Sequence, residues 1–365
     1  MTSYLGDLKE YFVLSRKEAA GIAACVLLAI ISYVVTRGTL LENGPRVLPA
    51  ELFVQDPVFS ALSKVGPIVL ALLLGLLINS RILMPGAAYS GKYLLRVAIA
   101  LMGARVTVDV LSMASPIGVV IILGVMAFTL GIALYLGKRW GMERDTSSLI
   151  GTGNSICGVS ACLCVAPVVN ARPHNLHAVI GVISILGLVG VFLVPWIASA
   201  AGLTDAQSAV LIGGSLHEIG NVVPAAEIYQ NVLGGGDVLG LVLAYKMIRV
   251  AMLVVVAYIL AQMISRQTDE NKKGVFVKPQ GFLLVFVGVA AAVSLLIVLE
   301  PSLGGDVKTM LVNVSTSLLT VAMAGVGLAM ELRGTIRTGA RLLPVTTLVW
   351  IAQLILLLGL TVILV

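Results

Sequence analysis

The chain has 365 residues, of which 59% are hydrophobic and only 12% charged, and its mean hydropathy is +1.05. Soluble domains carry roughly a quarter of charged residues, so this composition excludes a soluble globular protein and predicts an integral membrane protein. The formal net charge of +6 is spread along the connections between apolar segments, which indicates membrane orientation and not a surface for nucleic acid.

Apolar segments of about 20 residues, the length needed to cross a bilayer, recur along the chain. They predict an all-α polytopic membrane protein with about eleven transmembrane helices. The expected spans are 18–36, 58–79, 90–111, 116–136, 147–167, 175–200, 205–233, 239–263, 281–299, 307–332 and 341–365. The third has only a short apolar core, so we expect a broken or a cavity-lining helix there.

Two of these spans resemble each other. LLRVAIALMGAR from Leu94 and LLTVAMAGVGLA from Leu318 share identical residues at six positions. Six spans separate the copies, so the copies face opposite ways if each crosses the membrane once, as in the inverted repeats of transporters. The chain 1–365 is then a single transmembrane transporter domain, divided into 1–57 (first span and polar connection), 58–170 (first repeat half), 171–280 (central spans) and 281–365 (second repeat half).

Lys and Arg are concentrated in every second connection between the expected spans. Cytoplasmic connections carry this excess, so the pattern predicts a multi-pass protein of the inner (cytoplasmic) membrane with a cytoplasmic N-terminus. The first apolar run, Ile22 to Val35, is followed by no small-residue cleavage site, which favours a retained span over a signal peptide.

The fifth expected span, SSLIGTGNSICGVSACLCVAP over 147–167, is poorly suited to a continuous helix. Gly151 and Gly153 each weaken a helix interior by up to about 1 kcal/mol relative to Ala, and the side chains of Thr152, Asn154 and Ser155 compete for backbone hydrogen bonds. Helices broken in this way form the binding sites of many secondary transporters. The alternative is a helix face of small residues that lets two spans approach closely.

The seventh and eighth expected spans contain ionisable residues near their centres. LIGGSLHEIGNVVPAAEI places His217, Glu218 and Asn221 in the seventh, while Lys246 and Arg249 lie three residues apart on one face of the eighth. Ionisable side chains inside a membrane face cavities, pair with each other or take part in transport.

We therefore expect Lys246 and Arg249 to bind an anionic substrate together with helix N-termini. Gly151, Thr152, Gly153, Asn154, Ser155 and Asn221 are the other candidate substrate-binding residues. His217 and Glu218 are candidates for carrying a coupled proton. The alternative is a structural ion pair between Glu218 and one of the two cations.

Five motifs occur in order along the chain: LLRVAIALMG from Leu94, LIGTGNSICGVSA from Leu149, HEIGNVVPAA from His217, YKMIRV from Tyr245 and LLTVAMAGVGL from Leu318. They closely resemble the sulfate exporter family of bacterial inner-membrane proteins, the YeiH type, from about residue 60 to the C-terminus. The resemblance implies a carrier related to the cation:proton antiporter and bile-acid transporter superfamily, with two helix bundles and crossed discontinuous helices.

The function expected is secondary active transport of a small anion, either an inorganic oxyanion such as sulfate or a small sulfonate or carboxylate. The alternative is a cation:proton (Na⁺/H⁺) antiporter, for which only Glu218 provides a suitable acid at a break. An enzyme is not expected, because Ser155 or Ser215 with His217 matches no catalytic motif. The expected partners are the anionic solute, H⁺ or Na⁺ and the lipid bilayer, while a homodimer is left open.

No cofactor is expected, since the sequence lacks a GxxxxGK[ST] nucleotide-binding motif. No metal site is expected either. Cys157, Cys162 and Cys164, followed by His174 and His177, fit no standard spacing of metal ligands.

Overall fold

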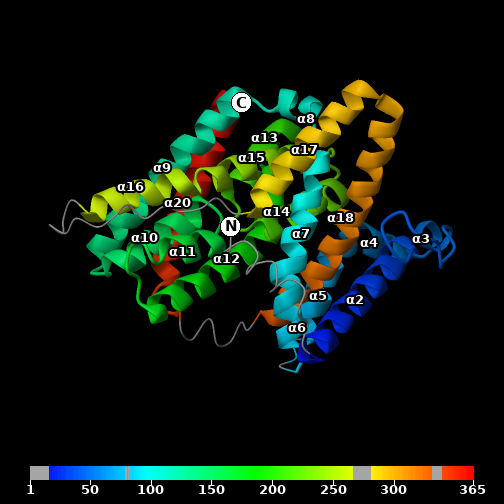
Figure 1. The fold of residues 1–365 in the computed structure, drawn as a ribbon, viewed down its shortest axis with the longest axis horizontal. Helices are drawn as coiled ribbons and strands as arrows, with labels where there is room; N and C mark the ends of the chain where they lie inside the picture. The colour runs from blue at the N-terminus through cyan, green and yellow to red at the C-terminus, as the bar shows by residue number, and fades with distance from the viewer. Residues whose placement is uncertain (1–15, 79, 81, 266–280, 331–338) are drawn as a thin grey trace, which may run out of the picture. The chain divides into compact units, whose positions relative to one another are not determined.

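The computed structural model describes residues 16–78, 80, 82–265, 281–330 and 339–365. The described elements are helices, apart from one antiparallel bridge between Thr39 and Arg46 (Figure 1). In chain order they are α2 (Arg16–Arg37), α3 (Leu52–Gln55), α4 (Pro57–Val65), α5 (Pro67–Ile78), α6 (Met84–Tyr89), the π-helix η1 (Ser90–Leu94), α7 (Leu95–Leu101), the 3₁₀-helix η2 (Met102–Arg105), α8 (Val108–Met113), α9 (Pro116–Arg139), α10 (Arg144–Ser155), α11 (Val159–Val165), α12 (Pro173–Ala200), α13 (Asp205–Ser215), α14 (Ile219–Glu227), the π-helix η3 (Ile228–Val232), α15 (Leu239–Ala251), α16 (Leu253–Ser265), α17 (Gly281–Leu299), α18 (Pro301–Ala329) and α20 (Leu343–Leu364).

Six helices of the described residues are long and apolar enough to cross a membrane, and a seventh is formed if the bent pair α4 and α5 is one span. These six are Glu18–Arg37, Pro116–Arg139, Pro173–Ala200, Leu239–Leu260, Pro301–Ala329 and Leu343–Leu364. The prediction of an all-α polytopic membrane protein is therefore confirmed. The predicted number of about eleven spans is not confirmed, because several apolar segments are divided into shorter helices.

The chain divides into two compact units. Unit 1 contains residues 1–105 and 285–331, and unit 2 contains residues 106–284 and 332–365. The predicted repeat halves, 58–170 and 281–365, have different boundaries and remain predictions. The predicted orientation also remains a prediction, since 1–15, 266–280 and 331–338, which hold many of the basic residues behind it, lie outside the described residues.

Unit 1 is organised around α18, which contacts α2, α5, α6 and α7. Glycines allow its closest contact, the one with α5. A Cβ atom added to Gly327 would collide with the carbonyl oxygen of Leu72, and one added to Gly75 would collide with that of Ala324. Small residues are typical where membrane helices approach at backbone distance.

The two repeated sequences lie within unit 1, on η1 to η2 and on α18, and these elements are in contact. Gly91 lies against Val326, and Gly325 lies against the backbone of α6. The first copy ends in a break at Val106 and Thr107, so the span predicted over 90–111 is interrupted, as its short apolar core indicated. Whether the copies are inverted remains a prediction.

Unit 2 has the 28-residue helix α12 in contact with four shorter helices, α10, α11, α13 and α14. The predicted break in 147–167 is confirmed, because α10 ends at Ser155 and α11 begins only at Val159. A second break separates α13, which ends at Ser215, from α14, which begins at Ile219. Both breaks fall in segments whose residues predicted a functional site.

The glycine contact between α5 and α18 gives a test of packing in unit 1. Replacing Gly327 with Ala should lower the free energy of unfolding by about 1–3 kcal/mol, because the added methyl group forces the two backbones apart. Thermal unfolding of the purified protein in detergent measures this change. The matched control is Gly288→Ala in α17, where no atom lies within 4 Å of the added Cβ, so stability should hold or rise. Equal losses in both variants would contradict the packing account.

Candidate functional site

The candidate site is formed by the two helix breaks of unit 2. The first break spans Ile156 to Gly158 and the second spans Leu216 to Glu218. A helix that ends leaves its last carbonyl groups without intrahelical partners, and a helix that begins leaves its first N–H groups free. Within a membrane these groups must find partners in the protein or in a water-filled cavity.

Lys246 of α15 supplies partners for both breaks. Its Nζ atom donates hydrogen bonds to the carbonyl oxygens of Ile156 at 2.9 Å, Leu216 at 2.6 Å and His217 at 2.8 Å. The side chain is fully buried. An ammonium group has three donors, so all the donors of Lys246 are engaged by backbone carbonyls.

Arg249 lies on the same face of α15, as its three-residue spacing from Lys246 predicted, and it is also fully buried. Its Nε donates to Ser155 O at 2.9 Å and its Nη2 to Asn154 O at 2.7 Å, both at the end of α10. Its Nη1 donates to Leu216 O at 3.0 Å and to Gly213 O at 3.4 Å, at the end of α13. The guanidinium group therefore joins the same two helix ends.

The two cations thus lie at the C-terminal ends of α10 and α13, where the helix dipole is negative. The sequence hypothesis expected them to act beside helix N-termini, so the structure gives them a different local partner. The alternative of an ion pair with Glu218 is not formed, since the hydrogen bonds of both cations go to backbone carbonyls among the described residues. Direct substrate binding by Lys246 or Arg249 remains a prediction.

Glu218 lies at the second break, immediately before α14, and its side chain is only partly buried. Ser184 of α12 donates a hydrogen bond to its Oε1 at 3.4 Å. The first break is close by, because a Cβ added to Gly158 would lie 2.9 Å from Glu218 Cγ. Gly158 also has a φ of +61°, a left-handed conformation that favours glycine. Glu218 therefore lies at the second break with its Cγ atom next to the first.

The tautomer of His217 follows from its neighbour. Nδ2 of Asn154 donates to Ile150 O at 2.8 Å, which orients the amide and leaves its Oδ1 as an acceptor 2.9 Å from His217 Nε2. In the neutral imidazole Nε2 is then the protonated nitrogen and Nδ1 the acceptor. Nδ1 is buried and has no partner among the described residues.

The remaining predicted site residues divide into two groups. Asn221 lies beside α12, where a Cβ on Gly187 would collide with its Nδ2, and it is close to the second break. Gly151 and Gly153 instead serve helix packing, against Ala133 of α9 and Cys162 of α11 respectively. These two glycines therefore have the role given by the alternative prediction, which was a face of small residues that lets helices approach closely. The segment 147–167 is nevertheless also broken.

The hydroxyl groups of the first motif are turned back to their own helix. Thr152 Oγ1 donates to Ser148 O at 2.5 Å, and Ser155 Oγ donates to Thr152 O at 3.4 Å. Both side chains are fully buried. The structure therefore brings Asn154, His217, Glu218, Lys246 and Arg249 together, with Ser155 contributing its backbone carbonyl.

Three residues that complete the site are not predicted from the sequence: Ser184, Trp350 and Gln353. The Trp350 ring lies 5.5 Å from the His217 ring, and Gln353 Nε2 donates to Gly214 O at 3.2 Å. Trp350 Nε1 and Gln353 Oε1 are buried without partners in the described part of the chain. Buried polar atoms normally have a partner, in the protein or in ordered water. Gln353 was detectable in principle, as an amide in the middle of an apolar span.

Within the described residues, no three His, Cys, Asp or Glu side chains are placed to hold a metal ion. Cys157 and Cys162 are buried thiols near the first break, where Ser160 donates to Cys157 and Cys162 lies 3.4 Å from Leu149 O. These cysteines therefore behave as packed side chains.

The capping role of Lys246 is testable by stability. Lys246→Met removes three donors from buried carbonyl groups and should lower the free energy of unfolding by about 3 kcal/mol or more. Thermal unfolding in detergent and the yield of membrane-inserted protein measure the effect. The control is Lys138→Met, an exposed cation at the end of α9, which should change stability little. A Lys246→Met protein of native stability would show that the carbonyl contacts contribute little and would favour direct substrate binding.

Comparison with known proteins connects this site to a family. The model of the family described as conserved hypothetical protein 698 matches residues 20–346. A UPF0324 membrane protein of Wolinella succinogenes is 28% identical over 344 residues, which cover 92% of this chain and 94% of the relative. The UPF0324 inner membrane protein YeiH of Escherichia coli K12 is 30% identical over 295 residues, 78% of this chain and 80% of the relative.

A UPF0324 membrane protein of Photorhabdus laumondii is 28% identical over 306 residues, covering 78% of this chain and 82% of the relative. No solved structure matches the chain. The expected resemblance to YeiH-type proteins is confirmed, while none of these relatives carries sulfate export in its name. The chain belongs to the family of conserved hypothetical protein 698, whose relatives are named UPF0324 membrane proteins.

Proposed function

We propose that this protein is a secondary transporter of the inner membrane that moves a small anion together with a proton by alternating access. The observation that carries the proposal is the pair of helix breaks whose C-terminal ends are both capped by Lys246 and Arg249. Broken helices with ionisable groups at the break are the usual construction of transporter sites. The name inner membrane protein in the YeiH relatives supports the location.

The charges at the breaks leave about one net positive charge when Glu218 is ionised. Lys246 and Arg249 provide two positive charges, and ionised Glu218 provides one negative charge. The C-terminal ends of α10 and α13 contribute about half a negative charge each, and the N-terminal ends of α11 and α14 about half a positive charge each, so the helix ends cancel. The empty site therefore favours an anion, because uncompensated charge is costly in an apolar environment.

Protonation of Glu218 changes this balance and gives the coupling mechanism. The neutral carboxyl group leaves about two positive charges uncompensated, so an anion that enters the break is held more strongly. Proton and anion therefore favour each other's binding, because each offsets the charge that the other adds. Such mutual dependence is what couples a proton gradient to anion movement.

In this proposal Lys246 and Arg249 attract the substrate by their charge, while other groups contact it. The contacts come from the amides of Asn154 and Asn221 and from the N–H groups in the first turn of α14, whose dipole is positive at that end. His217 positions Asn154 through their hydrogen bond. The proposed substrate is an inorganic oxyanion such as sulfate, or a small sulfonate or carboxylate.

A cation:proton antiporter is the second candidate, because Glu218 is a partly buried carboxyl group at a helix break. In that mechanism Na⁺ and H⁺ would compete for Glu218. The two cations of α15 oppose the binding of a metal ion nearby, which is why we rank this function second.

The first prediction of this proposal concerns ligand binding. In a thermal-shift screen of sulfate, sulfite, thiosulfate, taurine, short carboxylates and Na⁺, an anion should stabilise the protein, by about 2.7 kcal/mol at 100 times its dissociation constant. Asn221→Val should weaken this stabilisation at least tenfold in apparent affinity. The control is Glu143→Gln, which changes an exposed ion pair with Arg172. A response to Na⁺ alone would support the antiporter instead.

The second prediction concerns proton coupling. In proteoliposomes Glu218→Gln should retain exchange of anion for anion and lose uptake driven by a pH gradient, because the neutral side chain mimics only the protonated state. Radiolabelled uptake with and without the gradient measures both activities, with Glu143→Gln as the control. If gradient-driven uptake persists in Glu218→Gln, another group carries the proton and the coupling mechanism is wrong.

A further inference from the structure

A pocket lies at the end of α2 in unit 1. Its volume is about 290 Å³, and its lining includes Thr36, Arg37, Thr39, Asn43, Arg46 and Phe53. We call it the Arg46 pocket. Arg37 is the last residue of a candidate membrane span, Glu18–Arg37, so the pocket lies where an apolar helix ends.

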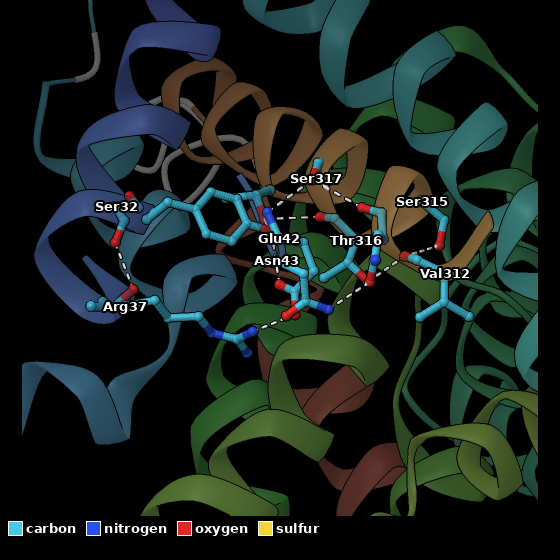
Figure 2. Close-up of polar contacts among 12 residues, drawn as sticks. Ser32, Arg37, Glu42, Asn43, Val312, Ser315, Thr316 and Ser317 are labelled. Atoms are coloured by element: carbon cyan, nitrogen blue, oxygen red, sulfur yellow. Dashed lines mark hydrogen bonds and ion pairs between the residues drawn. The ribbon is translucent and has the colours of Figure 1, made fainter. Parts of the chain in front are cut away.

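The loop that forms the pocket is held in place by polar contacts with α18. The Glu42 N–H donates to Ser317 Oγ at 3.2 Å, and Asn43 Nδ2 donates to Asn313 Oδ1 at 3.0 Å. Figure 2 shows Glu42 and Asn43 between Arg37 and Ser317, with the Arg37 guanidinium paired to the Glu42 carboxylate. The pocket is therefore preformed and does not depend on a ligand for its shape.

The loop is also closed on itself. Thr39 and Arg46 face each other in an antiparallel bridge, and the Val47 N–H donates to Gly38 O at 2.6 Å. The bridge brings the Arg46 side chain to the same pocket as Thr39. Two residues that are seven positions apart in sequence therefore contribute to one wall.

The charge of the pocket favours an anion. Its lining in the described part of the chain contains two arginines and no acidic residue. Glu42 is the ion-pair partner of Arg37, whereas the exposed guanidinium group of Arg46 has no acidic partner among the described residues. Thr39 Oγ1 is buried and likewise lacks a hydrogen-bond partner there. A guanidinium group beside a hydroxyl donor suits the oxygens of a phosphate.

The surroundings of the pocket favour a ligand with acyl chains. Leu40, Leu41 and Val47 of the loop are exposed apolar residues beside the pocket. The helix α4 is turned by 93° from α5, and it exposes 63% of Val58. A short amphipathic helix set across a span is typical of the membrane interface, where headgroups and the first acyl carbons meet.

We propose that the Arg46 pocket binds the phosphodiester group of a membrane phospholipid. Arg46 pairs with the phosphate oxygens and Thr39 donates its hydroxyl hydrogen to one of them. The acyl chains lie along the apolar residues of the loop and of α4. The lipid thereby adds a membrane contact to the loop 38–48, which its hydrogen bonds to α18 already hold in place.

The experiment distinguishes the contribution of the phosphate group to binding from the contribution of the acyl chains. The full-length protein in detergent is titrated with dioctanoyl phosphatidylglycerol, with dioctanoyl glycerol, which lacks phosphate, and with inorganic phosphate, which lacks chains. We expect saturable stabilisation in thermal unfolding with the phospholipid alone, at micromolar to millimolar concentrations. Equal affinity for inorganic phosphate would show a free oxyanion site, and equal affinity for dioctanoyl glycerol would show a purely apolar site; either result overturns the proposal.

The variants locate the binding. Arg46→Ala should weaken phospholipid binding at least tenfold, and Thr39→Val should weaken it less. Both residues are outside the helices of unit 1, so the unliganded melting temperature should change little. The control is Lys308→Ala, which removes a cation of α18 in the same unit but away from the pocket lining. Unchanged phospholipid affinity in both Arg46→Ala and Thr39→Val would show that the lipid binds elsewhere.

Discussion

The structure of unit 2 depends on one requirement, which is that the carbonyl groups at the ends of α10 and α13 must find donors away from water. Lys246 and Arg249 meet this requirement for both helices at once, with hydrogen bonds of 2.6 to 3.0 Å to Ser155, Ile156 and Leu216. A single helix, α15, therefore holds two breaks together. Without its cations neither break would be tolerated in an apolar environment.

This arrangement separates the groups that maintain the site from those that can change state. The three donors of Lys246 are occupied by backbone carbonyls, so this cation is fixed in place. Among the residues that the structure describes, Glu218 accepts one hydrogen bond, from Ser184, and is partly exposed, while Nδ1 of His217 retains an unused lone pair. Ligand-dependent changes are therefore expected at the second break, on a framework fixed by α15.

The sequence predicted the breaks better than it predicted their partners. Three glycines and several polar residues within 147–167 are unsuited to a continuous helix, a local property that can be read from residues alone. The three-residue spacing of Lys246 and Arg249 predicted that they share one face of a helix, because helical spacing is also a local property of the sequence. The packing of segments that are distant in sequence decides which helix ends these two cations contact. Their contact with the C-terminal ends of α10 and α13 was therefore not predictable from the sequence. The packing roles of Gly151 and Gly153 and the position of Trp350 beside His217 depend on neighbours from other helices in the same way.

The interaction energies also favour attraction of an anion by the two cations across several ångströms over direct contact between these cations and a substrate. Each charge-assisted hydrogen bond is worth roughly 1.5–3 kcal/mol, so giving up two of them would cost about 3–6 kcal/mol and reduce affinity by a factor of about 10² to 10⁴. An anion held about 7 Å from one cation, at an effective dielectric constant of about 20, gains roughly 2 kcal/mol without breaking any bond. Two such cations therefore supply useful attraction while the helix ends remain capped. In the proposed mechanism a substrate can leave again, because the two cations that attract it keep their hydrogen bonds to the backbone carbonyls.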